Sequence, residues 1–252
     1  MELPLFPLHT VLCPGIALPL HVFEERYREL VRDCLEAERP FGVVLIRQGR
    51  EVGGGTVSFA AIGTMAEIRQ AGRHPDGRFD LLVVGTHRFG IRSVASGPRP
   101  YLVAEVDELE EVVGDVEVAH SLANRATRRF VRYLELLQPR DGETADDVDV
   151  RVEVETEEAA PHGEPSPDDP SLLAAEGTER RVVIPDDPTT LSYLLAGIIQ
   201  IELSRRQALL EADTTEDRLR DLLALIDREV RFLSRRWRAF TPSPAELGPR
   251  RS

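Results

Sequence analysis

The spacing of apolar residues divides the chain into a first half of short strands and a second half of long helices. Up to about residue 113, apolar residues come in short runs or at every second position, which is typical of β-strands. Beyond residue 118 they recur every three or four positions, which is typical of helices that bury one face. The pattern therefore predicts an α+β protein with β structure first and helices after it.

The opening stretch, residues 3–22, mixes apolar residues with prolines. This favours extended backbone, because proline fixes φ and biases the residue before it away from helix. Pro14-Gly15 is a turn signal, so we expect the two extended stretches around it to fold back on each other. An amphipathic helix follows, and its apolar face is expected to hold Phe23, Tyr27, Leu30, Val31 and Cys34.

Further strands are expected at 41–46, 58–62, 64–70, 79–85, 89–94 and 101–109. The sequence His74-Pro75-Asp76-Gly77 predicts a hairpin turn between the third and fourth of these. Several short strands, one helix and frequent turns together predict a compact, barrel-like β domain over residues 1–113.

A connecting amphipathic helix is expected within residues 114–139, from Val118 until Pro139 ends it. The apolar face of this helix is predicted to contain Val118, Leu122, Ala126, Phe130, Tyr133, Leu134 and Leu137. Residues 140–180 are rich in Asp, Glu and Pro, and such a composition buries too little apolar area to order itself. We expect a disordered linker there, and we favour a flexible connector over a dedicated acidic binding tail.

Order is expected to resume at residue 181. Asp187-Pro188 is a helix start, with an acidic cap before a proline at the first helical position. A second helix is expected to begin at Asp213 or Thr214. The helices of residues 181–240 should pack together as a bundle, and residues 241–252 read as a frayed tail. The apolar positions of this part are Leu191, Leu194, Leu195, Ile198, Ile199, Ile201, Leu219, Leu222, Leu223, Ile226, Val230 and Leu233, with Trp237 and Phe240 after them.

Three blocks of sequence carry a family resemblance. They are LPLFPLHTVLCPGIALPLHVFEERYRELV near the start, then GTMAEIRQAGRHPDGRFDLLVVGTHRFGI, and finally DDPTTLSYLLAGIIQIELSRRQALLEADTTEDRLRDLLALI. In this order they resemble the N-terminal, substrate-binding domain of Lon, an ATP-dependent protease, and above all its free-standing bacterial forms. The resemblance implies a PUA-like pseudo-barrel followed by helices, and a role in recognising proteins.

Composition and charge narrow the possible partners. The chain has 252 residues, of which 42% are hydrophobic and 30% charged, as expected for a globular protein. Its formal net charge of −13 works against non-specific binding to nucleic acid or to anionic membranes. All 31 basic residues are arginine. Apolar runs are too short to span a bilayer, and the prolines near the N-terminus argue against a signal peptide, so we expect a cytoplasmic protein.

The sequence gives little support for nucleotide binding or for a catalytic site. The loop Gly49–Thr56 resembles a phosphate-binding loop, but Gly55 occupies the position where lysine would be needed. Because the chain contains no lysine, a Ser–Lys dyad is also excluded, and with it the peptidase chemistry of full-length Lon. No Gly-x-Ser-x-Gly motif is present. We therefore expect no enzyme activity.

The sequence evidence for a metal site is equally weak. His9, Cys13, His21 and Cys34 could converge on zinc, but no Cys-x-x-Cys or His-x-x-x-His pair supports this. The two cysteines lie among apolar residues, where a thiol behaves as a small core side chain. We expect neither a metal site nor a cofactor.

Two groups of residues remain as candidates for binding a partner. Phe6, Phe23 and Tyr27 are expected in the core, and they would form a peptide-binding site only if they lined an exposed apolar groove. The arginine ridge on the helix at 118–138 could bind an acidic partner, RNA phosphate or the chain's own acidic segment 141–158, although a solvated helix face with local ion pairs is the simpler interpretation. The ridge consists of Arg125, Arg128, Arg129 and Arg132.

The resemblance and these residues together predict a non-catalytic module that binds unfolded or extended polypeptide. It could act as an adaptor for a protease or a chaperone in protein quality control. The alternative is an RNA-binding module that uses the arginine ridge, which the net charge disfavours.

Overall fold

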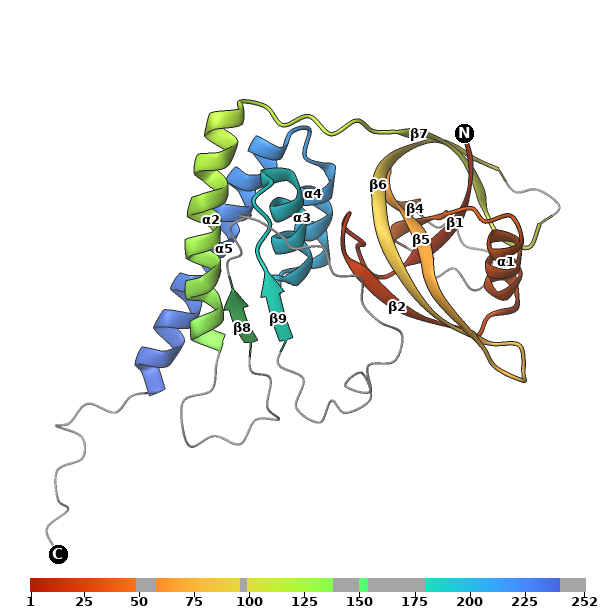
Figure 1. The fold of residues 1–252 in the computed structure, drawn as a ribbon, viewed down its shortest axis with the longest axis horizontal. Helices are drawn as coiled ribbons and strands as arrows, with labels where there is room; N and C mark the ends of the chain where they lie inside the picture. Colours follow the sequence, from red (N-terminus) through yellow and green to blue (C-terminus); the bar gives the residue numbers. More distant parts are fainter. Residues whose placement is uncertain (49–57, 96–98, 138–149, 154–179, 241–252) are drawn as a thin grey trace, which may run out of the picture.

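The computed structural model describes residues 1–48, 58–95, 99–137, 150–153 and 180–240, and they form nine strands and five helices (Figure 1). The strands are β1 Glu2–Leu8, β2 Ala17–Val22, β3 Phe41–Gln48, β4 Ser58–Phe59, β5 Ile62–Arg73, β6 Phe79–Ala95, β7 Val103–Glu108, β8 Val150–Glu153 and β9 Arg180–Val183. The helices are α1 Glu25–Glu36, α2 Val116–Leu137, α3 Pro188–Ile198, α4 Leu203–Glu211 and α5 Thr215–Phe240.

Seven strands form one mixed sheet that closes on itself. Its order is β1-β7-β6-β5-β3-β4, with β2 added on β6. Strand β1 also pairs with β3 in parallel, placing Phe6 opposite Val43, so that β1, β7, β6, β5 and β3 form a ring. The other pairings within this sheet are antiparallel. Strands β8 and β9 form a separate parallel pair.

The expectation that the first two extended segments pair with each other is wrong. The turn at Pro14-Gly15 is present, with Gly15 at φ 76°, but β1 lies between β3 and β7, whereas β2 pairs with β6. The chain between the two strands does not turn straight back, because residues 11–13 bury their side chains in the core. Two short strands linked by such a buried connection cannot form a tight hairpin.

Strand β6 is a single strand of 17 residues, where the sequence suggested two strands at 79–85 and 89–94. It pairs with β2 and β5 over its first half and with β5 and β7 over its second half. The irregular register around Ile91 and Ser93 allows the strand to bend, so that it can pair with all three neighbours. The predicted hairpin turn is confirmed, and Gly77 supplies its positive φ of 85°.

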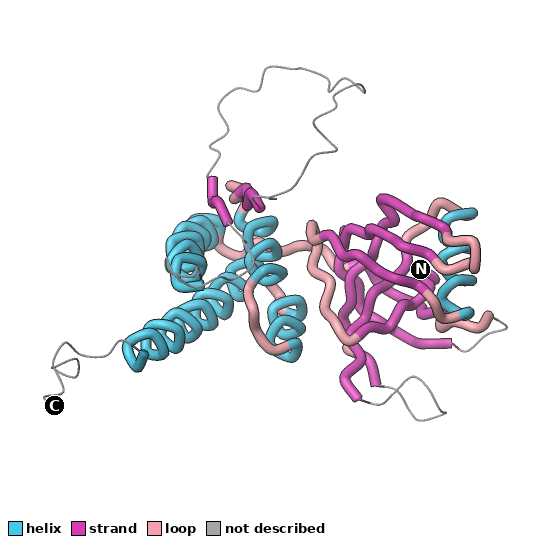
Figure 2. Tube along the Cα trace, turned by 90° about the horizontal axis from the view of Figure 1, so that it is seen from below, coloured by secondary structure: helices cyan, strands magenta, loops and turns pink. Residues whose placement is uncertain are grey.

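Helix α1 covers the sheet on the side away from the other helices (Figure 2). Its buried residues are Tyr27, Leu30, Val31 and Cys34, as the spacing predicts. Phe23 differs from the prediction, because the helix begins only at Glu25 and the Phe23 side chain is 63% exposed.

The remaining helices gather on the other side, where α2 and α5 run along each other (Figure 1). Most of the predicted face of α2 is buried, but Val118 and Leu137 are exposed. Ala119 and Ala123 are buried instead, so the buried stripe is centred on small residues that let α5 approach closely. Val118 therefore lies at the edge of the stripe, whereas Leu137 shares the buried face but is the last residue of the helix.

Helix α3 begins as predicted, since the Asp187 carboxylate accepts a hydrogen bond from the Thr190 amide at 2.7 Å. It ends at Ile198, which is exposed, and α4 follows as a separate helix that the apolar pattern did not reveal. Arg206 of α4 donates to the carbonyl oxygens of Ala196 and Ile199 at 3.0 and 2.8 Å. The guanidinium thus satisfies carbonyl groups that the end of α3 leaves free.

Helix α5 begins after Thr214, whose hydroxyl accepts a hydrogen bond from the Asp217 amide at 3.0 Å, in agreement with one of the two predicted starts. Several predicted features lie outside the described residues: the loop 49–56, most of 140–180, the tail after 240 and the side chains of Trp237 and Phe240. Within the segment expected to be disordered, the structure does describe strand β8.

One apolar cluster joins the sheet to the helices. Val11, Cys13, Leu45 and Ala60 from the sheet side belong to the same buried cluster as the inner faces of α2 to α5. Gln207 of α4 adds a hydrogen bond to the Ile62 carbonyl at 3.0 Å. Among the helices in the described ranges, none combines the length and the apolar character that crossing a membrane would need.

Candidate functional site

An apolar groove lies where the ends of β1 and β2 meet the start of α1, and its volume is about 330 Å³. The sheet forms one wall and the first turn of α1 forms the other. The lining residues are Phe6, Pro7, Leu8, His9, Leu20, His21, Val22, Phe23, Glu24, Arg26, Tyr27 and Ile46. All three aromatic residues singled out in the sequence therefore line one groove.

The three aromatic side chains take different places in the groove. Phe6 and Tyr27 stack on each other, with ring centroids 4.2 Å apart and planes at 14°, and they are only 6% and 4% exposed. They form a rigid floor. Phe23 is 63% exposed and stands at the rim. The expectation of a core position is thus confirmed for Phe6 and Tyr27 and is wrong for Phe23.

The exposure of Phe23 has a local cause. Glu24 is the residue that precedes the first turn of α1, so Phe23 occupies the position from which an apolar side chain normally packs onto the fourth helical residue. That residue is Arg28, whose guanidinium instead bonds the Glu25 carboxylate at 2.5 Å and the Asp76 carbonyl at 3.2 Å. Arg28 therefore offers Phe23 no apolar side chain of the kind that this position normally packs on.

Polar groups of the groove lie at its edge. The Arg26 guanidinium lies 4.6 Å from the centre of the Tyr27 ring and bonds the Glu24 carboxylate at 2.8 Å. Its charge is therefore balanced within the rim. His21 lies beside Phe23, with ring centroids 6.2 Å apart. The groove thus offers an apolar floor, one exposed aromatic ring and a rim that carries both signs of charge.

The arginine ridge lies on a different part of the molecule. All four of its residues are exposed on α2, away from the groove at α1 (Figure 1). Arg129 pairs with Asp227 of α5 at 3.0 Å, and Arg132 pairs with Glu135 at 2.7 Å. Arg125, Arg128 and Arg129 border a small polar hollow with Leu223 and Asp227. Carboxylates therefore neutralise at least half of the positive charge that RNA phosphates would need.

The zinc arrangement considered from the sequence does not form. Cys13 and Cys34 are buried in separate apolar clusters, and burial raises the pKa of each thiol to about 11. His21 lies instead with His74 and Asp80, two residues that the sequence analysis did not select. Only the pairing of β2 with β6 brings these three together, and no local signal in the sequence announces that pairing.

Comparison with known proteins agrees with this fold. Residues 2–228 match the family model of the ATP-dependent protease La (LON) substrate-binding domain. The chain is 26% identical to the Lon protease of Anaeromyxobacter dehalogenans over 234 residues, covering 92% of this chain and 24% of that protein. It is 27% identical to Lon protease 1 of Thermus thermophilus, and this match covers 91% of this chain and 25% of that protein. The chain thus spans about a quarter of the length of these curated relatives.

Two solved structures have a similar fold. A Lon N-terminal domain protein from Xanthomonas campestris superposes with a TM-score of 0.55 at 27% identity, covering 89% of this chain and 98% of the other. The N-terminal domain of Lon protease from the Mycobacterium avium complex gives a TM-score of 0.56 at 18% identity. This superposition covers 90% of this chain and 98% of the other. Both comparisons extend over the sheet and the helices.

Proposed function

Because the chain belongs to the family of Lon protease substrate-binding domains, we propose that it recognises extended or partly unfolded polypeptide through the groove between β1, β2 and α1. The observation that carries the proposal is the exposed ring of Phe23 above a stacked aromatic floor. A singly exposed apolar side chain is common on protein surfaces, but an exposed ring beside an apolar groove forms a larger patch, and such patches mark binding surfaces.

The groove suits an apolar side chain of a client better than a charged one. Its floor is two stacked rings, and its polar rim groups Glu24 and Arg26 already satisfy each other. Strand β2 pairs with β6 as a branch off the ring, and we infer that its other edge can accept backbone hydrogen bonds from an extended client. Such binding would have an affinity on the order of micromolar, because a disordered client loses conformational entropy.

We further propose that the chain divides as the sequence suggests. Residues 1–113 would form a PUA-like β pseudo-barrel, 114–139 a connecting helix, 140–180 a linker, 181–240 a helical bundle and 241–252 a tail. The closed ring of strands supports the barrel, and the apolar cluster shared by α2 to α5 supports the bundle.

The proposed role is that of an adaptor that has no catalytic chemistry of its own and delivers clients to a protease or a chaperone. The matches to this chain fall on the substrate-binding domain of the longer relatives, which supports a recognition role. In this proposal the purified chain neither hydrolyses ATP nor cleaves casein. Activity that follows the protein through purification would contradict it.

Fluorescence anisotropy with a labelled, reduced and carboxymethylated α-lactalbumin tests the groove. We expect saturable binding that Phe23→Ser weakens at least tenfold, with little change between low and high salt. The matched control is Phe232→Ser on α5, since Phe232 is 61% exposed and lies far from the groove in the chain's other half. Equal losses in both variants would contradict the assignment to the groove.

A mixed pool of labelled RNA, titrated in parallel, separates the proposal from its alternative. RNA that binds along the arginine ridge would dissociate steeply as salt rises. RNA binding that disappears on replacing the ridge arginines, with no polypeptide binding, would contradict the proposed function.

A further inference from the structure

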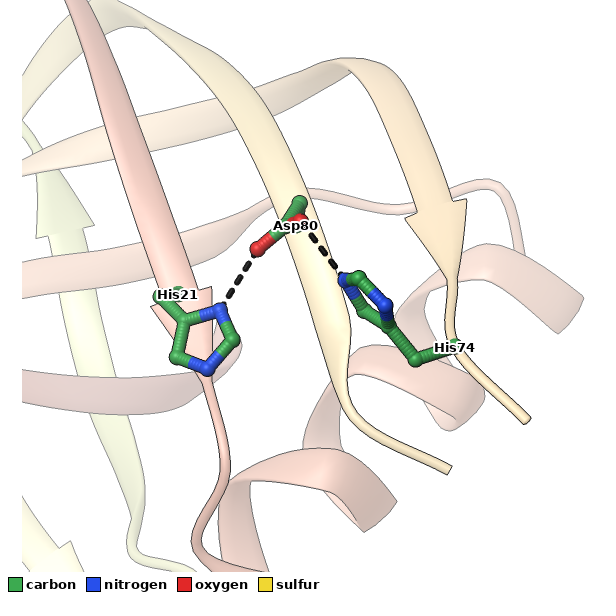
Figure 3. A group of neighbouring side chains, drawn as sticks. All are labelled: His21, His74 and Asp80. Atoms are coloured by element: carbon green, nitrogen blue, oxygen red, sulfur yellow. Dashed lines mark hydrogen bonds and ion pairs between the residues drawn. The ribbon is translucent and has the colours of Figure 1, made fainter. Parts of the chain in front are cut away.

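Two histidines and one aspartate converge at the end of the β2–β6 ladder (Figure 3). Asp80 lies between the two imidazoles and contacts each with a different carboxylate oxygen. His21 Nδ1 is 2.6 Å from Asp80 Oδ1, and His74 Nε2 is 2.6 Å from Asp80 Oδ2. One ligand atom from each residue can be chosen so that all three lie within 4.8 Å of one another.

The backbone holds these residues in place. His21 and Asp80 are directly opposite each other in the antiparallel pairing of β2 with β6, so their side chains leave the same face of the sheet. His74 is fixed by the hairpin turn, where its amide donates to the Arg78 carbonyl at 2.9 Å and its carbonyl accepts from the Gly77 amide at 2.9 Å. Each of the three side chains therefore extends from a backbone that is held by hydrogen bonds, and only its own rotation is needed to coordinate an ion.

We propose that His21, His74 and Asp80 bind a divalent transition-metal ion of the zinc class at the rim of the groove. Two imidazole nitrogens and one carboxylate oxygen are a ligand set that Zn²⁺ accepts, with a fourth position left to water or to another donor. The inference stands on the three side chains and does not depend on the proposed binding of polypeptide.

Binding the ion requires the three side chains to move. In a tetrahedral zinc site with bonds of about 2.0–2.1 Å, neighbouring ligand atoms are roughly 3.3 Å apart. The present contacts of 2.6 Å are hydrogen bonds to two different carboxylate oxygens, and the ion would replace both. Ligand atoms that now lie up to 4.8 Å apart would have to approach one another by up to about 1.5 Å, which rotation of the side chains allows. All three side chains are at least one-third exposed, so they are free to make this movement and the open position faces water.

Neighbouring charges are compatible with the ion. Arg78 Nη1 lies 3.5 Å from His21 Nε2, the nitrogen that points away from Asp80. Coordination through Nδ1 places the ring proton on Nε2, so Arg78 would turn toward Asp76, which it already bonds at 2.7 Å. The two thiols of the chain do not compete for the metal, because Cys13 and Cys34 are buried.

The proposed metal site lies next to the groove, so a bound ion could contact whatever the groove holds. His21 lines the groove and also belongs to the cluster, so a bound ion would lie at the groove's rim close to Phe23. Its open fourth position would present a Lewis acid to whatever occupies the groove.

Isothermal titration of ZnCl₂ into the full, untagged chain, freed of metal with a chelator, tests the site. We expect one ion per chain with a dissociation constant on the order of micromolar, and at least a tenfold loss in His74→Gln and in Asp80→Asn. His87→Gln is the control, because His87 is likewise an exposed histidine with a carboxylate neighbour, Glu108, at 3.8 Å. This control should bind zinc as the unchanged protein does.

Co²⁺ gives a second readout that a non-specific surface site would not produce. We expect a visible absorption band typical of low-coordinate cobalt, lost in His74→Gln and retained in His87→Gln. Circular dichroism confirms that each variant is folded, and His74 is the safest substitution since it lies in a turn and not in a strand. Absence of saturable binding, or equal binding in His74→Gln and His87→Gln, would overturn the proposal.

Discussion

The guanidinium of Arg88 on β6 lies 2.8 Å from the carboxylate of Glu111, and the same guanidinium reaches across to the helices. Its Nη1 donates to the carbonyl oxygens of Leu210 and Ala212, at 2.9 and 2.7 Å, where α4 ends. The Glu111 carboxylate also pairs with Arg218 of α5, at 3.4 Å. Arg88 is only 3% exposed, so this network ties sheet to helices in a place largely closed to water.

Replacing Arg88 by methionine should destabilise the protein by about 3 kcal/mol. The change keeps most of the volume, but it leaves the carbonyl groups of Leu210 and Ala212 without this donor and removes one of the donors to the partly buried Glu111 carboxylate, which keeps Arg218 and the Tyr193 hydroxyl. Urea unfolding followed by circular dichroism measures the loss.

Arg92→Met is the matched control for this change. Arg92 lies on the same strand and also pairs with a carboxylate, that of Asp107, but on the exposed surface. Exposed ion pairs contribute little, so its unfolding midpoint should hardly move. A loss as large as that of Arg88→Met would contradict the role given to the buried network.

Gly85 should not tolerate a side chain. A Cβ atom there would lie 2.4 Å from the Cys13 carbonyl oxygen, and backbone cannot move aside cheaply. We expect Gly85→Ala to lower the free energy of unfolding by about 2 to 4 kcal/mol. At Gly72, on the paired strand β5, the nearest atom would be 3.8 Å away. Gly72→Ala should therefore stay within about 1 kcal/mol of the unchanged protein, and a loss equal to that of Gly85→Ala would refute the steric explanation.

The cysteines should react only when the chain unfolds. Burial raises the pKa of Cys13 and of Cys34 to about 11, so at pH 8 roughly one thiol in a thousand is the reactive thiolate. Ellman's reagent should find almost no thiol within minutes in native protein, and two per chain in guanidinium chloride. Rapid reaction of one thiol in the native state would show that the apolar cluster around that cysteine opens locally.

Tyr101 should make stability depend on pH under alkaline conditions. Burial, together with the hydrogen bond that its hydroxyl donates to the Asp33 carboxylate, raises its pKa from 10.0 to about 12. The folded state thus favours the protonated phenol, so the stabilisation is complete below pH 10 and is lost as the pH rises from 10 to 12.

The variant Tyr101→Phe isolates this effect. It should lose less stability between pH 10 and 12 than the unchanged protein, as followed by chemical unfolding at each pH. Ultraviolet titration of tyrosinate should show one fewer high-pKa phenol in the variant. Identical alkaline profiles for the two proteins would count against the assignment.

Local signals in the sequence predicted local structure well. The buried positions of α1 follow from helical spacing, the start of α3 from Asp187 and Pro188, and the β5–β6 hairpin from the turn that contains Gly77. Each of these depends on residues close in the chain, whose backbone preferences act before any tertiary contact forms.

Long-range pairing could not be predicted in the same way. Nothing local indicates that β2 pairs with β6 and not with β1, yet that register brings His21 to Asp80. The groove was only half predictable. Its aromatic residues could be named from the sequence, whereas the exposure of Phe23 depends on where α1 begins, and the spacing of apolar residues placed Phe23 on the buried face of that helix.

Strand β1 cannot reach all of its neighbours until β7 has left the ribosome, because the ring of strands closes through β7 at residues 103–108. At typical synthesis rates, the roughly 100 residues between them take about 5 to 20 s to emerge. Leu3 and Leu5 are buried in the finished ring, and until then the side of their cluster that Ala104 and Val106 of β7 supply is missing. The ring therefore closes late in the synthesis of this half of the protein, because its first strand waits for its last one.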